Sequence, residues 1–230
     1  MAVQRTTSSM SIDPASQNSS TNILVVDLDG TLIRSDTFIE MIVGGLFRYP
    51  LDTLMALFSL RKGRAIAKRK LSESIPFETD NLPFNPELLS YIKREKESGR
   101  ELHLVSAADQ SIVDKISERF GIFKSAVGSN GKNNLKGHAK ASYLAKRFPE
   151  GFTYAGNSSS DIPVWDKSKS IVLVNTNSRL TSKIRKNYQV DVVLDQRNQS
   201  FVDWIKTLEA GYHITVVFIK QAGDLSRVQK

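Results

Sequence analysis

One stretch near the start of the chain constrains the fold most strongly. Residues 23–32 have the sequence Ile-Leu-Val-Val-Asp-Leu-Asp-Gly-Thr-Leu. An aliphatic, β-branched run of this kind is typical of a strand buried on both faces, as in parallel sheets. It ends in Asp27 and Asp29, and Gly30 permits the sharp turn that lets the chain leave the strand. Ligands bind at the carboxyl ends of strands in open α/β sheets, so this sequence predicts a site there.

The two acids of this stretch predict a bound cation. Asp27 and Asp29 are two residues apart, so their side chains can converge on one small volume. Two carboxylates so close repel each other unless a cation lies between them. Hard oxygen ligands without a nearby sulfur or imidazole set favour Mg²⁺. We therefore expect a magnesium site after the first strand.

Composition narrows the class of protein. The chain has 230 residues, which is enough for one full core and a small second unit. It contains no cysteine, which excludes disulfides, thiolate catalysis and Cys-ligated zinc and is typical of a reducing, cytoplasmic setting. The formal net charge of +8 favours an anionic partner, whether a phosphate ester, nucleic acid or an acidic membrane surface. Residues 1–20 are rich in Ser, Thr, Gln and Asn, and we expect a disordered leader.

Residues 35–74 show helical periodicity and no strand signal. Tyr49-Pro50 interrupts the apolar pattern, which predicts a helical hairpin. We interpret it as a small cap over the site, because Glu40, Arg48 and Asp52 interrupt a run that otherwise approaches the length of a bilayer span. Contact with a membrane surface stays open as an alternative. A basic cluster follows, consisting of Arg61, Lys62, Arg64, Lys68, Arg69 and Lys70. It is interpreted either as a solvated helix face or as a surface that binds anionic lipid headgroups.

The rest of the chain alternates between helix and strand signals. Asn85-Pro86 predicts a helix start and Gly99 its end. Strands are predicted at 101–105, 151–155, 171–174 and 190–194, with helices ending at 121 and beginning near 137. This alternation predicts a parallel sheet covered on both faces. Residues 201–208 have helical spacing, and 212–219 look strand-like or otherwise apolar.

Polar residues follow three later strands in a recognisable order. They occur in Leu-Val-Ser-Ala-Ala-Asp around Ser106, in Asn-Asn-Leu-Lys-Gly around Lys136, and in Tyr-Ala-Gly-Asn-Ser-Ser-Ser-Asp at residues 154–161. With Asp-x-Asp-Gly-Thr at the first strand, they resemble the four motifs of the haloacid dehalogenase (HAD) superfamily. The resemblance implies an α/β, HAD-like Rossmannoid three-layer sandwich with a parallel sheet and a small helical cap inserted after the first strand. We expect the core at 21–34 and 84–210, the cap at 35–83 and a C-terminal extension at 211–230.

The resemblance also implies the catalytic roles. Asp27 would attack phosphorus and form an aspartyl-phosphate, and Asp29 would act as general acid and then general base. Lys136 would offset the negative charge of phosphoryl transfer. Its place in Lys-Gly-x-x-Lys favours it over Lys132 and Lys140.

Phosphate and metal ligands follow from the same motifs. The phosphoryl oxygens would be bound by the Ser106 hydroxyl and adjacent backbone N–H groups at Ala107, with Gly30 and the loop-steadying Thr31. The predicted Mg²⁺ ligands are Asp27, the backbone carbonyl of Asp29, Asn157 and Asp161. Asn157 stands where the family usually has an acid, so one negative charge is missing. Alternatively, Asp161 caps the helix that follows.

A narrower resemblance covers roughly residues 22–208. Here the motifs are similar to the HAD domain N-terminal to some UbiA-like polyprenyl-phosphate phosphoribosyltransferases. The prediction is therefore a magnesium-dependent phosphatase that hydrolyses a small phosphate monoester, in the cytoplasm or at the cytoplasmic face of a membrane. The alternative is a non-catalytic or weakly catalytic domain that partners a membrane prenyl or phosphoribosyl transferase. Dehalogenation is disfavoured, and so is nucleic-acid binding, because the basic run lacks interleaved aromatic residues. Oligomeric state is left open.

Overall fold

The computed structural model describes residues 22–80, 82–130 and 133–194. The predicted leader at 1–20 and the predicted C-terminal extension at 211–230 lie outside the described residues. So do residues 195–210 of the predicted core, including the predicted helix at 201–208, and Lys132.

The described residues form a sheet of six parallel strands, in the order β3-β2-β1-β4-β5-β6. Strand β1, the predicted Asp-bearing strand, lies inside the sheet between β2 and β4. This arrangement confirms the predicted parallel α/β sheet. The strands are β1 (Ile23–Val26), β2 (Glu101–Asp109), β3 (Ser125–Ser129), β4 (Thr153–Gly156), β5 (Ser170–Val174) and β6 (Val190–Leu194).

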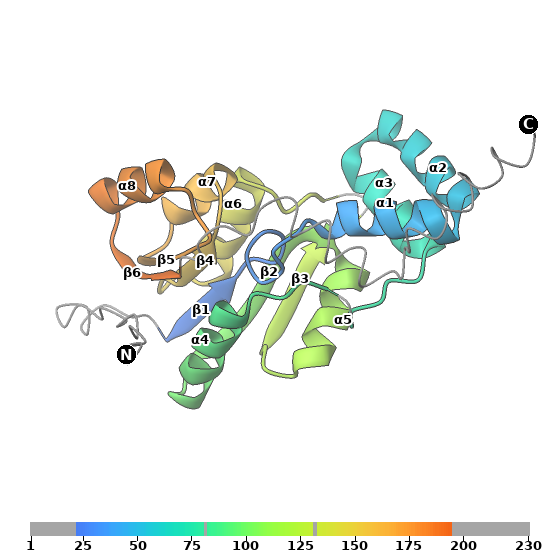
Figure 1. Ribbon diagram of the computed structural model, residues 1–230. Coiled ribbons are helices and arrows are strands. Elements are labelled where there is room, and N and C mark those ends of the chain that lie inside the picture. Colours follow the sequence, from blue (N-terminus) through green and yellow to red (C-terminus); the bar gives the residue numbers. More distant parts are fainter. Residues whose placement is uncertain (1–21, 81, 131–132, 195–230) are drawn as a thin grey trace, which may run out of the picture.

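Helices cover both faces of this sheet (Figure 1). Leu24 and Val26 of β1 belong to one apolar cluster, together with residues of α4 (Pro86–Glu97) and α5 (Gln110–Phe120). Val25 belongs to the other cluster, with α6 (His138–Arg147), α7 (Ile162–Trp165) and α8 (Ser178–Asn187). Because neighbouring residues of a strand point to opposite faces, the unbroken apolar run of β1 supplies both cores. The predicted three-layer sandwich is confirmed.

Helix α4 shows how local sequence sets an element's start. The Asn85 side chain accepts hydrogen bonds from the backbone N–H groups of Glu87 and Leu88, and Pro86 occupies the first helical position. These are the preferred residues at the two positions. The predicted start is therefore confirmed, while the helix ends at Glu97, two residues before Gly99.

Three elements of the core differ from expectation. Strand β2 continues to Asp109, with a register shift against β3 between Val105 and Asp109, so Ser106 lies within the strand and not after it. Strand β3 and helix α8 were not predicted. Strand β3, Ser-Ala-Val-Gly-Ser, lies at the sheet edge and carries one bulky apolar residue, and α8 has Ile184 as its one buried residue. Strand β3 is therefore short and weakly apolar, and α8 carries only two apolar residues, Leu180 and Ile184.

The segment between β1 and α4 forms a helical lobe, which we define as residues 37–74. It contains α1 (Thr37–Arg48), α2 (Pro50–Phe58), a 3₁₀ turn η2 (Ser59–Lys62) and α3 (Arg64–Ser74). The break at Tyr49-Pro50 is where it was predicted, and it separates α1 from α2. A third helix, α3, which the sequence analysis did not distinguish, follows Gly63, whose φ is 122°. Among the described helices, none has both the length and the apolar character needed to cross a bilayer.

The two segments that join the lobe to the core run side by side. The backbone N–H of Arg34 donates to the carbonyl of Pro83 at 2.9 Å, and that of Asn85 donates to Leu32 at 2.9 Å. Between these bonds, Ile33 and Phe84 form an antiparallel bridge. The lobe therefore leaves and rejoins the core at one place, beside the end of β1.

Candidate active site

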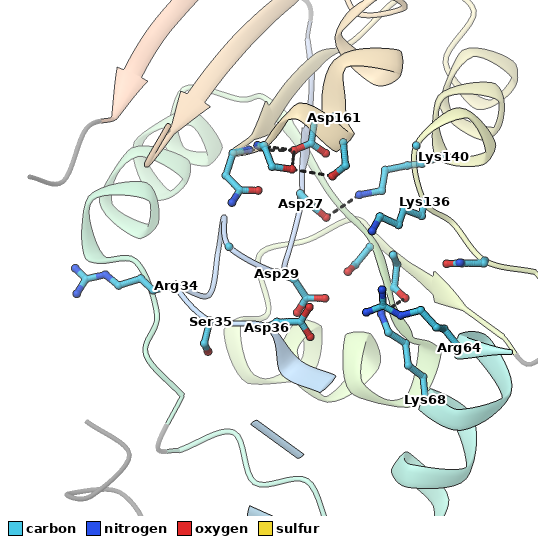
Figure 2. A pocket seen from close by; sticks show the side chains of 18 residues that line it. Asp27, Asp29, Arg34, Ser35, Asp36, Arg64, Lys68, Lys136, Lys140 and Asp161 are labelled. Carbon is cyan, nitrogen blue, oxygen red and sulfur yellow. Dashed lines mark hydrogen bonds and ion pairs between the residues drawn. The ribbon is translucent and has the colours of Figure 1, made fainter. Parts of the chain in front are cut away.

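A cavity of about 370 Å³ lies where the carboxyl end of β1 faces the helical lobe (Figure 2). Its wall comes from the turn after β1, the end of β2, the start of α6, the loop after β4, and α3 of the lobe. Eight of the nine predicted site residues line it: Asp27, Asp29, Gly30, Ser106, Ala107, Lys136, Asn157 and Asp161. The ninth, Thr31, is fully buried behind the wall, and its hydroxyl lies 3.4 Å from Oδ1 of Asn157.

Asp27 carries a close ion pair at the bottom of this cavity. The Nζ of Lys140 donates to Oδ1 of Asp27 at 2.7 Å and to the Tyr154 hydroxyl at 2.9 Å. All three side chains are buried. Burial nevertheless raises the pKa of Asp27 to about 6, against the lowering effect of Lys140, and nearby Asp161 and Asp29 raise it further. The ion pair with Lys140 therefore only partly offsets the effect of burial on Asp27.

Lys140 is a residue that the sequence analysis set aside in favour of Lys136. Figure 2 shows both lysines at the cavity, with the dashed contact running from Lys140 to Asp27. Lys136 is exposed, and its ammonium makes no ion pair with a described residue. A signal for Lys140 was present in the periodicity, because it shares the buried face of α6 with Ala141 and Leu144. A lysine on the apolar face of a helix needs a buried partner.

Asp29 lies nearer the lobe than Asp27 does. Its Oδ1 accepts a hydrogen bond at 2.8 Å from the backbone N–H of Thr37, the first residue of α1. Burial and the neighbouring charge of Asp36 raise the pKa of Asp29, and the Thr37 bond and Lys68 oppose that rise. A carboxyl group with a raised pKa is suited to carrying a proton.

The end of β2 supplies the opposite wall. The Ser106 hydroxyl accepts from the backbone N–H of Ala108 at 3.0 Å, so its own proton can be donated into the cavity. The backbone carbonyl of Ala107 accepts from Lys68 of α3 at 3.0 Å. Lys68 therefore bridges lobe and core, and with Arg64 one turn earlier it adds positive charge to the cavity (Figure 2).

The loop after β4 is organised by Asp161. One oxygen of its carboxylate accepts from the backbone N–H groups of Asn157 and Ser158 at 3.1 and 3.0 Å, and the other accepts from the Tyr154 hydroxyl at 3.1 Å. Asp161 also completes a capping box with Ser158. The sequence alternative, that Asp161 caps the helix that follows, is wrong, because its side chain makes no capping hydrogen bond to α7. The carboxylate reaches back to the preceding loop instead and lies on the cavity wall.

Asn157 lies directly against the turn after β1. A Cβ atom added to Gly30 would collide with the Asn157 side-chain amide, and Gly30 has a φ of 75°. Both conditions require glycine at position 30. The close approach brings the amide of Asn157 to the same cavity as Asp27 and Asp29.

The oxygen donors of the cavity fit a hard divalent cation. The cavity is lined by all four residues that were predicted to bind Mg²⁺: Asp27, Asp29 through its backbone carbonyl, Asn157 and Asp161. Burial, and after it the charges of Asp161 and Asp29, raise the pKa of Asp27, and a bound cation would oppose that rise. Within the described ranges, no group of three His, Cys, Asp or Glu side chains is placed to hold a metal ion. Coordination would thus depend on the Asn157 amide, the Asp29 carbonyl and water, as Mg²⁺ tolerates.

Comparison with known proteins identifies similar chains. The family model described as haloacid dehalogenase-like hydrolase matches residues 24–166. An uncharacterized protein, y4nM, of Sinorhizobium fredii (strain NBRC 101917 / NGR234) is 38% identical over 186 residues, which are 80% of this chain and 36% of that protein. The chain thus spans about a third of the length of this relative.

Solved structures share the fold at low sequence identity. A phosphoserine phosphatase in its apo form aligns with a TM-score of 0.54 and 18% identity, covering 76% of this chain and 94% of that chain. A probable phosphoserine phosphatase from Vibrio cholerae aligns with a TM-score of 0.54 and 13% identity, covering 86% and 69%. At these identities the likeness is one of fold.

Proposed function

Because the matched region covers more than half of the chain, this protein belongs to the haloacid dehalogenase-like hydrolase family, and we propose that it is a magnesium-dependent phosphatase of small phosphate monoesters. One observation carries the proposal. The cavity brings together a buried carboxylate, Asp27, its cation partner Lys140 and a second acid, Asp29. A nucleophile, a charge-stabilising cation and an acid within one volume are what transfer of a phosphoryl group to a carboxylate needs.

Asp27 is the proposed nucleophile. Lys140 holds its Oδ1, while Oδ2 accepts no hydrogen bond from a described residue. Oδ2 attacks phosphorus, a P–O bond forms to Asp27, and the P–O bond to the leaving alcohol breaks. Asp29 gives its proton to the leaving oxygen, and the raised pKa of Asp29 supports that role.

Hydrolysis of the aspartyl-phosphate completes the cycle. Asp29, now ionised, takes a proton from water, whose oxygen attacks phosphorus and displaces the Asp27 carboxylate. Ser106 and the backbone at Ala107 and Gly30 are the proposed donors to the phosphoryl oxygens. Mg²⁺, held by Asp27, the Asp29 carbonyl, Asn157 and Asp161, would neutralise phosphoryl charge.

The cavity wall points to a strongly polar substrate. Five cationic side chains line it: Arg34, Arg64, Lys68, Lys136 and Lys140. Among the described lining residues no side chain is aromatic, so the wall offers no stacking surface for a base or aryl group. This supports a phosphorylated small molecule as the substrate class.

The test is phosphate release from a panel of sugar phosphates and a generic aryl phosphate, with and without Mg²⁺. Wild type is compared with Asp27→Asn and with Asp114→Asn. Asp114 is an exposed acid of α5 that contacts Gln110, so it controls for the loss of a carboxylate elsewhere. Activity that requires both Mg²⁺ and Asp27, and that survives Asp114→Asn, is the expected result.

A second candidate function rests on Asn157. With an amide in place of an acid and Asp161 engaged by backbone donors, the site has less charge for a metal. The alternative is a non-catalytic or weakly catalytic domain that partners a membrane prenyl or phosphoribosyl transferase. This alternative would be favoured if wild type and Asp114→Asn bound Mg²⁺ equally well and neither released phosphate. Asn157→Asp then distinguishes the two, because it restores turnover only if the missing charge was limiting.

A further inference from the structure

The exposed large apolar side chains of the protein gather in one segment. Within the described residues, all nine that are classed as exposed lie between positions 39 and 60: Ile39, Leu46, Phe47, Tyr49, Leu51, Leu54, Met55, Phe58 and Leu60. The most exposed are Leu51 at 76%, Met55 at 73%, Phe58 at 65% and Phe47 at 63%. Single exposed apolar residues are ordinary, but a contiguous group of this kind marks an interaction surface.

Helix α2 arranges most of these side chains on one face. Leu51, Leu54, Met55 and Phe58 recur at the spacing of one helical stripe, while Thr53 and Ala56 point into the protein. The helix therefore turns an apolar stripe to solvent. We call Phe47, Leu51, Leu54, Met55 and Phe58 the α2 patch.

Positive charge borders the patch where α2 ends. Arg61 lies over the Phe58 ring, with its guanidinium carbon 4.2 Å from the ring centroid. Lys62 and Arg64 follow in the next turn and are exposed. Within the part of the chain that the structure describes, these three cations form no salt bridge. An apolar helix face with a cationic border is the composition of helices that rest in the interface of an anionic bilayer.

We propose that the α2 patch docks on an anionic phospholipid surface, with Leu51, Met55 and Phe58 entering the acyl boundary and Arg61 and Lys62 facing headgroup phosphates. Charge complementarity selects this occupant. If two copies paired through the patch with their α2 helices parallel, Arg61 and Lys62 would face the same cations of the second copy; an antiparallel pairing would leave these cations at the two ends of the apolar contact. A lipid surface instead offers anions to the border and hydrocarbon to the patch. The proposal is independent of catalysis, because none of these residues belongs to the proposed chemistry.

Docking of the patch on a membrane would also hold the cavity close to the membrane surface. The turn η2 connects the patch directly to α3, whose Arg64 and Lys68 line the cavity wall. The lobe thus carries the lipid-facing surface and one wall of the cavity on consecutive elements.

The first experiment is co-sedimentation of the full chain with phosphatidylcholine vesicles, with and without 30% phosphatidylglycerol (about a third anionic lipid, enough to set a negative surface potential). Wild type should sediment with the anionic vesicles and be released by high salt. Leu51→Gln/Met55→Gln/Phe58→Gln should lower the partition coefficient at least about tenfold. Arg61→Gln/Lys62→Gln should lower it on anionic vesicles, whereas the charge-matched Lys93→Gln/Lys96→Gln on α4 should not.

The lack of cysteine in the chain permits a site-specific second readout. An environment-sensitive fluorophore on Met55→Cys should shift to the blue on anionic vesicles, and the same label on exposed Lys93→Cys should not. Asp27→Asn should bind vesicles as wild type does, which separates this test from the phosphatase test.

Two results would overturn the proposal. One is wild type that stays in solution with both kinds of vesicle, with circular dichroism showing it folded. The other is a concentration-dependent dimer in sedimentation velocity that the triple Gln variant abolishes while no vesicle binding is seen, since the patch would then pair with itself.

Discussion

The sheet core and the helical lobe differ in what they do with apolar side chains. Every strand of the core sends its apolar residues into one of two buried clusters. The lobe buries Phe38, Met41 and Leu71 but leaves the α2 patch in solvent. The apolar residues of the core are thus explained by packing, whereas those of the α2 patch belong to neither buried cluster of the described residues and are not explained in this way.

The largest expected effect concerns the core chemistry. Asp27→Asn removes the proposed nucleophile while keeping a group that can accept from Lys140, so turnover should fall by about 10³-fold or more. Steady-state phosphate release measures it, and thermal unfolding checks that the variant folds. If the variant kept wild-type turnover, the core would not hold the chemistry, and the lobe would have to be searched instead.

The second prediction contrasts packing in the two regions. Leu88→Ala, at a fully buried position of α4, should lower the free energy of unfolding by about 2–5 kcal/mol. Leu54→Ala, at a 56% exposed position of α2, should change it by no more than about 0.5 kcal/mol. Urea titration followed by circular dichroism gives both values. A large loss for Leu54→Ala would mean that the patch packs against something in the free protein, and the contrast would disappear.

The third prediction separates a core cation from a lobe cation. Lys140→Met removes the partner of Asp27 and should lower kcat by about 10²-fold. Lys68→Met removes positive charge from the lobe side of the cavity and should raise KM, by about tenfold, more than it lowers kcat. Kinetics on one substrate with both variants measures the difference. Lys136→Met is the needed comparison, and a larger kcat loss there than in Lys140→Met would favour the lysine chosen from the sequence.

The smallest expected effect is a pH dependence of core stability. Burial lowers the pKa of His103 in β2 below its ordinary 6.5, and Ser125 contacts its Nδ1 at 2.7 Å. A histidine with a lowered pKa contributes its full stability above pH 6.5 and loses it as pH falls through 6.5 toward the folded-state pKa, because the unfolded chain binds the proton first. His103→Gln should flatten the fall of Tm between neutral pH and pH 5. If Tm fell equally steeply between neutral pH and pH 5 in His103→Gln and wild type, His103 would not be the cause of the pH dependence.

Much of the core was predictable because its signals are local. The apolar run before Asp27 identifies an inner parallel strand, and Asn85-Pro86 identifies a helix start. Strand β3 was not predicted because an edge strand of small residues buries little apolar surface. Helix α8 was not predicted because it has few apolar residues. The third lobe helix escaped because Gly63 can as easily lie within a helical run as end one.

The site was predictable as a set of residues but not as a set of contacts. Eight of the residues predicted from the order of the motifs line the same cavity. Lys136 precedes the first residue of α6, whereas Lys140 lies inside the helix on its buried face. The motif spacing favoured Lys136, and only the fold shows that Lys140 is the buried lysine that contacts Asp27.

The paired segments at Ile33 and Phe84 have a consequence for how the lobe can vary. Since they are already bonded to each other, the intervening chain closes a loop whose ends are fixed by the core. The entropy of closing a loop grows slowly with its length, by about 0.6 kcal/mol for each doubling. A lobe of another size or sequence can therefore be spliced between positions 34 and 83 with little thermodynamic penalty, which makes this junction a natural point for exchanging modules.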